Sequence, residues 1–183
     1  MNKKSNNLNN LLEFNKQFVN DKQYKNYNST KYPCKKIAVL SCMDTRLTEL
    51  LPAALNIKNG DVKIIKNAGA QISHPFGSVM KSLLIAVYNL EVTDIMVVGH
   101  LDCGVKSLNY ADMSAKMLDR GITKEAIDSC GIDLTKWLKG FKSERDSVIE
   151  SVNLIKHHPL LPKDVNIYGF LIDPTTGELS SVI

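Results

Sequence analysis

Two short stretches of the sequence hold side chains that can bind a metal ion. The stretch CMDTR (residues 42–46) carries a thiol, a carboxylate and a guanidinium, and the stretch HLDC (residues 100–103) carries an imidazole and a second thiol. The two thiols and the imidazole, Cys42, His100 and Cys103, form a set that suits Zn²⁺. Three protein ligands leave a fourth tetrahedral position for water or substrate, so the set indicates a catalytic rather than a structural metal site.

The spacing of His100 and Cys103 is a weak signal by itself, because any four-residue window can hold such a pair by chance. The position of both stretches in the chain strengthens it. Each follows a stretch typical of a buried strand: the apolar run of residues 37–40 before the first, and residues 94–99, apolar after Asp94, before the second. In open α/β sheets, ligands bind at the carboxyl ends of the strands, so we expect these side chains to converge there. The alternative is two buried thiols and a core histidine.

Alternation of strands and helices runs from residue 35 to the end of the chain. It predicts an α/β fold with a central, mostly parallel sheet of four strands, one antiparallel edge strand and helices on both faces. The expected strands are residues 36–41, 62–66, 94–100, 165–172 and 178–183. The expected helices are residues 47–57, split or shortened by Pro52, residues 76–90 after Pro75, and a helix from Ser143 to Ile155. Residues 104–142 contain short helical pieces whose order the sequence leaves open.

The N-terminal part of the chain, residues 1–34, is expected to be a helical extension of a single domain spanning residues 1–183. It is polar and rich in asparagine, yet Leu8, Leu11, Leu12, Phe14 and Phe18 recur at roughly helical spacing. We expect this stripe to pack across the domain or onto a partner subunit.

Composition excludes several classes of protein. The 23 basic residues exceed the 19 acidic ones by only four, and no basic block is interleaved with aromatic residues, so we expect no nucleic-acid partner. No apolar run approaches the ~18 residues that span a bilayer, and the first residues lack the apolar core of a signal peptide, so we expect no membrane partner. Four cysteines in such a chain are better read as thiols or ligands than as disulfides, which favours a reducing, cytoplasmic location.

CMDTR and HLDCG resemble the two zinc-binding motifs of the β-class carbonic anhydrases. The loop NAGA (residues 67–70) and the ending GFLIDPTTGEL (residues 169–179) are similar to the short bacterial and archaeal branch of that family. The resemblance covers residues 35–183. It implies one Zn²⁺ per subunit, held by Cys42, His100 and Cys103, and hydration of CO₂ to bicarbonate by attack of a zinc-bound hydroxide. It also implies Asp44 and Arg46 as a catalytic dyad.

The chemistry of the dyad agrees with that assignment. Asp44 could orient the nucleophile or take the fourth position on the metal itself, and Arg46 can grip its carboxylate at two points and hold it away. A merely structural ion pair is the alternative. Asp102 either supports the ligands or is only a turn carboxylate.

Substrate would meet close-approaching backbone at Ala68, Gly69 and Ala70, and Met43, Ile72 and Val105 are placed to add apolar surface. The family resemblance further implies a homodimer or a dimer of dimers. Two other functions stay open: hydrolysis of CS₂ or COS at the same zinc site, and a catalytically silent zinc-binding regulatory module. An intact Asp44 and Arg46 argues against the second.

Overall fold

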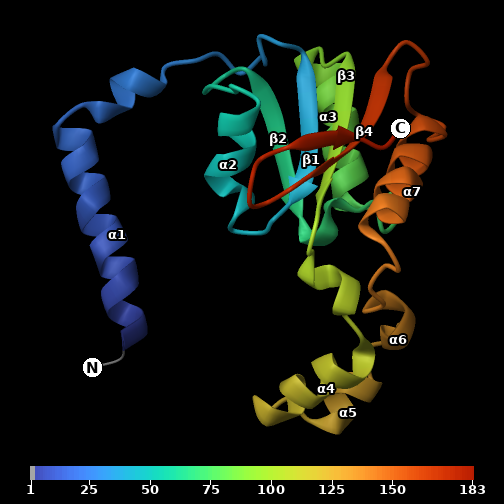
Figure 1. Cartoon of the computed structure of the whole chain (residues 1–183). Coiled ribbons are helices and arrows are strands. Elements are labelled where there is room, and N and C mark those ends of the chain that lie inside the picture. The colour runs from blue at the N-terminus through green and yellow to red at the C-terminus, as the bar shows by residue number, and fades with distance from the viewer. Residues whose placement is uncertain (1–2) are drawn as a thin grey trace.

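The centre of the fold is a five-stranded sheet in the order β2-β1-β3-β4-β5. It is seen in a computed structural model that describes residues 3–183 (Figure 1). β1 to β4 are mutually parallel, and β5 pairs with β4 in the antiparallel sense, as the sequence predicted. The strands are β1 Ile37–Cys42, β2 Val62–Asn67, β3 Asp94–His100, β4 Asn166–Ile172 and β5 Leu179–Ser181.

Helices cover both faces of the sheet, which confirms the predicted fold class. On one face, α3 (Ser78–Leu90) and α7 (Glu144–Lys156) pack against Ala38 and Leu40 of β1. On the other face, α2 (Leu47–Ala54) packs against Val39. Both faces of β1 are therefore buried, which explains why its sequence is continuously apolar.

The strand order reverses at β1. The chain passes from β1 to β2 on one side and then crosses to β3 on the other, so the carboxyl ends of β1 and β3 lie side by side. This reversal is the usual place for a ligand site in an open parallel sheet. The residues that follow β1 and β3 therefore face one another.

The start of α3 differs from the predicted one, whereas the end of α2 follows the prediction. α3 begins at Ser78 rather than at residue 76, because the backbone turns first: the N–H of Phe76 donates to Nδ1 of His74, and the N–H of Gly77 donates to the carbonyl of His74. α2 ends at Ala54, two residues after Pro52, so the predicted shortening is observed.

Two segments project from the body of the fold (Figure 1). α1 (Lys3–Asn20) lies apart from the sheet, and its apolar side chains Leu8, Leu11, Leu12 and Phe14 are more than half exposed. The other segment, α4 to α6, is closed at its base by a hydrogen bond from the N–H of Gly140 to the carbonyl of Leu108 (2.8 Å). Its helices are α4 Tyr110–Asp119, α5 Lys124–Asp128 and α6 Leu134–Trp137.

Three short 3₁₀ turns complete the secondary structure: η1 Gln23–Tyr27, η2 Ala68–Ala70 and η3 Gly104–Ser107. η2 follows β2, and η3 follows the loop after β3, so both lie near the carboxyl ends of the parallel strands. Across residues 3–183, none of the helices has the length and apolar character needed to cross a membrane.

Candidate metal centre

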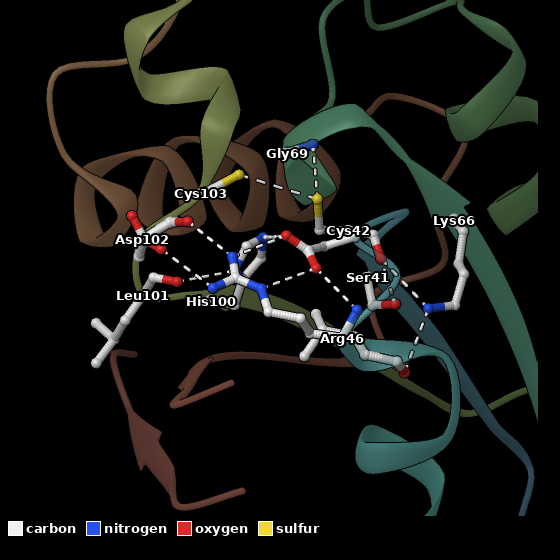
Figure 2. A network of polar contacts seen from close by, with 11 residues as sticks. Ser41, Cys42, Arg46, Lys66, Gly69, His100, Leu101, Asp102 and Cys103 are labelled. Carbon is white, nitrogen blue, oxygen red and sulfur yellow. Dashed lines mark hydrogen bonds and ion pairs between the residues drawn. The ribbon is translucent and has the colours of Figure 1, made fainter. Parts of the chain in front are cut away.

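The structure brings together the three side chains that the sequence selected as metal ligands (Figure 2). Cys42 ends β1, His100 ends β3, and Cys103 follows three residues later in the loop. All three are buried, and their ligand atoms lie within 4.8 Å of one another. The four cysteines of the chain are free thiols, so neither Cys42 nor Cys103 is consumed by a disulfide.

The imidazole of His100 is oriented as a ligand by its own backbone surroundings. Nδ1 lies 2.8 Å from the carbonyl oxygen of Leu101. Because a carbonyl can only accept, Nδ1 carries the proton and Nε2 keeps a free lone pair. Nε2 is buried and has no hydrogen-bond partner. A buried nitrogen lone pair without a partner is costly unless something binds it.

The arrangement fits a zinc ion. Two sulfur ligands, each about 2.3 Å from a tetrahedral Zn²⁺, lie about 3.8 Å apart, and the Sγ atoms of Cys42 and Cys103 are 3.9 Å apart. The donor set of two sulfurs and one imidazole nitrogen is the soft set that Zn²⁺ prefers over Mg²⁺ or Ca²⁺. The partnerless Nε2 of His100 supplies the third donor.

The two thiols differ in their electrostatic surroundings. Burial tends to raise the pKa of Cys42, but the neighbouring His100 imidazole and the N–H of Gly69, 3.3 Å from its sulfur, lower it overall. At Cys103, burial raises the pKa, and the adjacent Cys42 sulfur raises it further. Two thiolates at this separation repel one another, so ionising both requires a cation between them.

Asp44 and Arg46 form a clamp beside this cluster. Nε and Nη2 of Arg46 donate to the two carboxylate oxygens of Asp44 at 3.0 and 2.9 Å, and the backbone N–H of Arg46 donates to Oδ1 at 2.9 Å. These contacts lower the pKa of Asp44 to about 2, so its carboxylate is charged at neutral pH. Oδ2 of Asp44 lies 3.8 Å from Nε2 of His100. The charged carboxylate therefore stands next to the partnerless nitrogen without binding it.

Arg46 also contacts the loop that joins His100 to Cys103 (Figure 2). Its Nη1 donates to Oδ2 of Asp102 at 3.1 Å, and its Nη2 donates to the backbone carbonyl of Asp102 at 2.9 Å. The guanidinium thus joins the loop after β1 to the loop after β3. The sequence left the role of Asp102 open, and the structure shows it bound to Arg46.

The loop after β2 closes the cluster from a third side. Gly69 and Ala70 of η2 are buried, whereas Ala68 is exposed. Gly69 adopts a φ of +82°, and a Cβ there would lie 2.5 Å from Nε2 of Gln71 and 3.2 Å from Cε1 of Phe141. The backbone conformation therefore favours glycine at this position, and an added methyl would displace the amide end of Gln71 and press on the ring of Phe141.

The expected apolar wall is only partly present near the metal ligands. Val105 packs in the same apolar cluster as Cys42 and Cys103. Ile72 is buried in the core on the opposite face of the sheet, and Met43 is 64% exposed. The sequence could not show which of these three side chains lies near the metal ligands, because that depends on the path of the loops that follow the strands.

Two supporting contacts were not found by sequence reasoning. Nζ of Lys66 donates to the carbonyl of Cys42 at 3.3 Å, and the carbonyl of Leu101 accepts from His100. Lys66 is an ordinary strand lysine in the sequence, and a backbone carbonyl leaves no trace in residue type. Neither contact had a readable signal.

Comparisons with known proteins agree with this geometry. The sequence model of a family described as carbonic anhydrase matches residues 37–179. The Bacillus subtilis protein named "Putative carbonic anhydrase YvdA" is 51% identical over 179 residues, covering 96% of this chain and 91% of the relative. The crystal structure of β-carbonic anhydrase isoform I from Trichomonas vaginalis superimposes with a TM-score of 0.90 at 33% identity, covering 100% of this chain and 98% of the other.

A more distant relative has a different name. The carbon disulfide hydrolase of an Acidianus species is 28% identical over 160 residues, covering 79% of this chain and 76% of the relative. The same fold family thus includes proteins named for two reactions.

Proposed function

The chain belongs to the β-class carbonic anhydrase family, and from this premise we propose that it hydrates CO₂ reversibly to bicarbonate and a proton at one Zn²⁺ per subunit. The observation that carries the proposal is the convergence of Cys42, His100 and Cys103, whose ligand atoms lie within 4.8 Å of one another. These three residues would hold the metal. Zn²⁺ bound there supplies a Lewis acid that lowers the pKa of water and so makes a nucleophile available near neutral pH.

Asp44 and Arg46 are proposed as the catalytic dyad. Asp44 is charged at neutral pH and has lone pairs left after accepting from Arg46. It can therefore accept a hydrogen bond donated by the attacking water and so orient that water toward CO₂. Arg46 holds the carboxylate at two points and keeps it from moving onto the ligand cluster. The dyad thereby keeps the metal accessible to water.

The backbone of residues 68–70 is proposed as the surface along which CO₂ approaches. Gly69 lets the chain pass close to Cys42, to whose sulfur its N–H donates at 3.3 Å. Ala68 and Ala70 add only methyl groups beside that path. A small, linear and uncharged substrate needs little more than this space.

Stopped-flow hydration of CO₂ by protein of measured zinc content, between about pH 6.5 and 9, tests the proposal. We expect turnover that scales with zinc content and that disappears after the metal is removed by a chelator. A zinc-loaded protein without CO₂ hydration above the buffer rate would refute it and leave two functions for the site: hydrolysis of CS₂ or COS, and a catalytically silent zinc-binding regulatory module.

Hydrolysis of CS₂ or COS is the second candidate, and the likeness to the Acidianus carbon disulfide hydrolase supports it. Both substrates are uncharged and linear, so the site residues alone do not discriminate against them. Sulfide release from CS₂, measured on the same zinc-analysed preparation, separates the two reactions. A CS₂ turnover exceeding that of CO₂ would replace the first proposal by the second.

We further propose that the chain works as a homodimer or a dimer of dimers in a reducing, cytoplasmic compartment. α1 supports this, because Leu11 is 69% and Phe14 61% exposed on a helix that lies apart from the sheet (Figure 1). A second copy would cover this stripe. Sedimentation analysis of the full chain and of the Leu11→Glu, Phe14→Glu double variant tests it: we expect the variant to shift toward the monomer, and a wild-type monomer at all concentrations would contradict it.

A further inference from the structure

Asp102 has an unusual backbone conformation beside the candidate metal centre. Its φ is +54°, in the left-handed region that residues other than glycine seldom adopt, although asparagine and aspartate tolerate it best. Strained backbone held at a functional site often marks a geometry that the site needs. At Asp102 the conformation turns two acceptors, the backbone carbonyl and the carboxylate, toward one guanidinium.

The guanidinium of Arg46 is correspondingly divided between two partners. Nε and Nη2 grip Asp44, while Nη1 and the same Nη2 reach Asp102. The Arg46 side chain is 41% exposed, so without a second anchor solvent would compete for it. Asp102 belongs to the loop between His100 and Cys103. This loop is held in place at one end by His100, the last residue of β3.

We propose that Asp102 is a positioning residue: its left-handed backbone anchors Arg46 and so keeps the Asp44 carboxylate in its gripped position. The backbone carbonyl carries most of this role. The carboxylate of Asp102 is 89% exposed, and ion pairs at such exposure contribute little because water screens them. The conformation of the residue therefore matters more than its charge. The catalytic part of this inference rests on the proposed function.

Three substitutions separate conformation from charge. Asp102→Asn keeps a residue that tolerates positive φ and removes the charge. Asp102→Gly removes the whole side chain and favours the left-handed region even more. Asp102→Ala removes the carboxylate and disfavours that region by about 1 kcal/mol, which corresponds to about a fivefold change in the ratio of left-handed to other conformations.

The first readout is the exchange of the Arg46 Nε–H with solvent, measured by ¹⁵N NMR. The chain has only three arginines, Arg46, Arg120 and Arg145, so the signal can be assigned by substitution. Nε of Arg46 donates to Asp44 and not to Asp102, so its exchange reports whether the clamp itself persists. It can be measured on metal-free protein and does not depend on turnover.

We expect Asp102→Ala to speed this exchange about fivefold and to lower kcat for CO₂ by at most the same factor, with KM and zinc content unchanged. Asp102→Asn and Asp102→Gly should stay within about twofold of wild type in both. Glu91→Ala is the matched control, since Glu91 also has a positive φ (+59°) and pairs with Lys36 at the surface. It should change neither readout.

Three results would overturn the proposal: wild-type exchange in Asp102→Ala, equal effects in the glycine and alanine variants, or loss of zinc in Asp102→Ala. The last would mean that the conformation serves Cys103 rather than Arg46. If the wild-type protein shows no CO₂ hydration, the proposed function fails, but exchange in the metal-free variants still decides the positioning role.

Discussion

Oδ2 of Asp44 lies 3.8 Å from Nε2 of His100, beyond hydrogen-bond distance, although both groups are polar and the nitrogen is buried without a partner. The carboxylate does not close this gap because Arg46 binds both of its oxygens. The separation leaves Nε2 of His100 free to bind a metal, and the grip of Arg46 would keep the Asp44 carboxylate from becoming a further ligand to it. Whether Asp44 stays away from the ligand cluster therefore depends on Arg46, a side chain that does not itself contact that cluster.

Arg46→Ala should separate metal binding from turnover. Without the guanidinium, Asp44 is free to move onto the cluster, so we expect turnover to fall about a hundredfold, the scale of a lost orienting group. Zinc content should stay at one per chain because the three ligands are unchanged. Stopped-flow assays and metal analysis of the same preparation measure both quantities.

Two further variants serve as comparisons for Arg46→Ala. Arg46→Lys keeps the charge but loses the two-point grip and should fall between wild type and Arg46→Ala. Arg120→Ala removes an exposed arginine in the projecting segment and should behave as wild type. Turnover of Arg46→Ala within threefold of wild type would exclude the clamp as a catalytic element.

Cys103→Ser should release the metal. A serine hydroxyl is a poor ligand for Zn²⁺ compared with a thiolate, and only Cys42 and His100 would remain. After dialysis, we expect a metal content below about one tenth of wild type, measured by inductively coupled plasma mass spectrometry. Activity should fall in proportion to the metal content. Cys130→Ser, at an exposed cysteine, is the matched control and should keep full occupancy. Full zinc occupancy in Cys103→Ser would show that the ligand assignment is wrong.

The cluster could be predicted because its position follows from the direction of the strands and from the reversal of strand order that such sheets contain. Cys42 and His100 each end a largely apolar strand, and parallel neighbours place such ends together. Asp102 could not be assigned, because its role depends on a left-handed φ that residue type does not fix.

The α4 to α6 segment shows a second limit. Its helix starts are local and readable, since Asn109, Thr123 and Asp133 cap them with their side chains. The path of the segment depends instead on Gly140, where a Cβ would lie 2.2 Å from the carbonyl oxygen of Val105. This contact between distant residues has no local pattern in the sequence, so the arrangement of the three helices could not be predicted.

Gly69→Ala should destabilise the protein more than Gly131→Ala does. Both positions have positive φ, +82° and +70°, so each alanine costs about 1 kcal/mol of backbone strain. Of the two, only the methyl added at Gly69 meets neighbours. The amide end of Gln71 can move aside, so the crowding against Phe141 should cost a further ~1 kcal/mol, the low end of overpacking costs. Chemical denaturation measures the difference in the free energy of unfolding. We also expect lower turnover in Gly69→Ala alone, because the N–H that donates to Cys42 would shift; equal unfolding free energies would refute the crowding argument.

Asp61→Asn should make Cys34 more reactive. Sγ of Cys34 lies 3.1 Å from Oδ1 of Asp61, and this hydrogen bond to a carboxylate is the main cause that raises the pKa of the Cys34 thiol. A raised pKa means less thiolate at any pH below it, and the thiolate is the reactive form. Removing the negative charge should therefore speed alkylation of Cys34 near pH ~8. At alkaline pH, where Cys34 is ionised in both proteins, the Cys34 alkylation rates of wild type and Asp61→Asn should converge. Peptide mapping by mass spectrometry follows Cys34, with Cys130 of the same molecule as the internal control. An unchanged Cys34 rate across this range would show that Asp61 does not hold the thiol protonated.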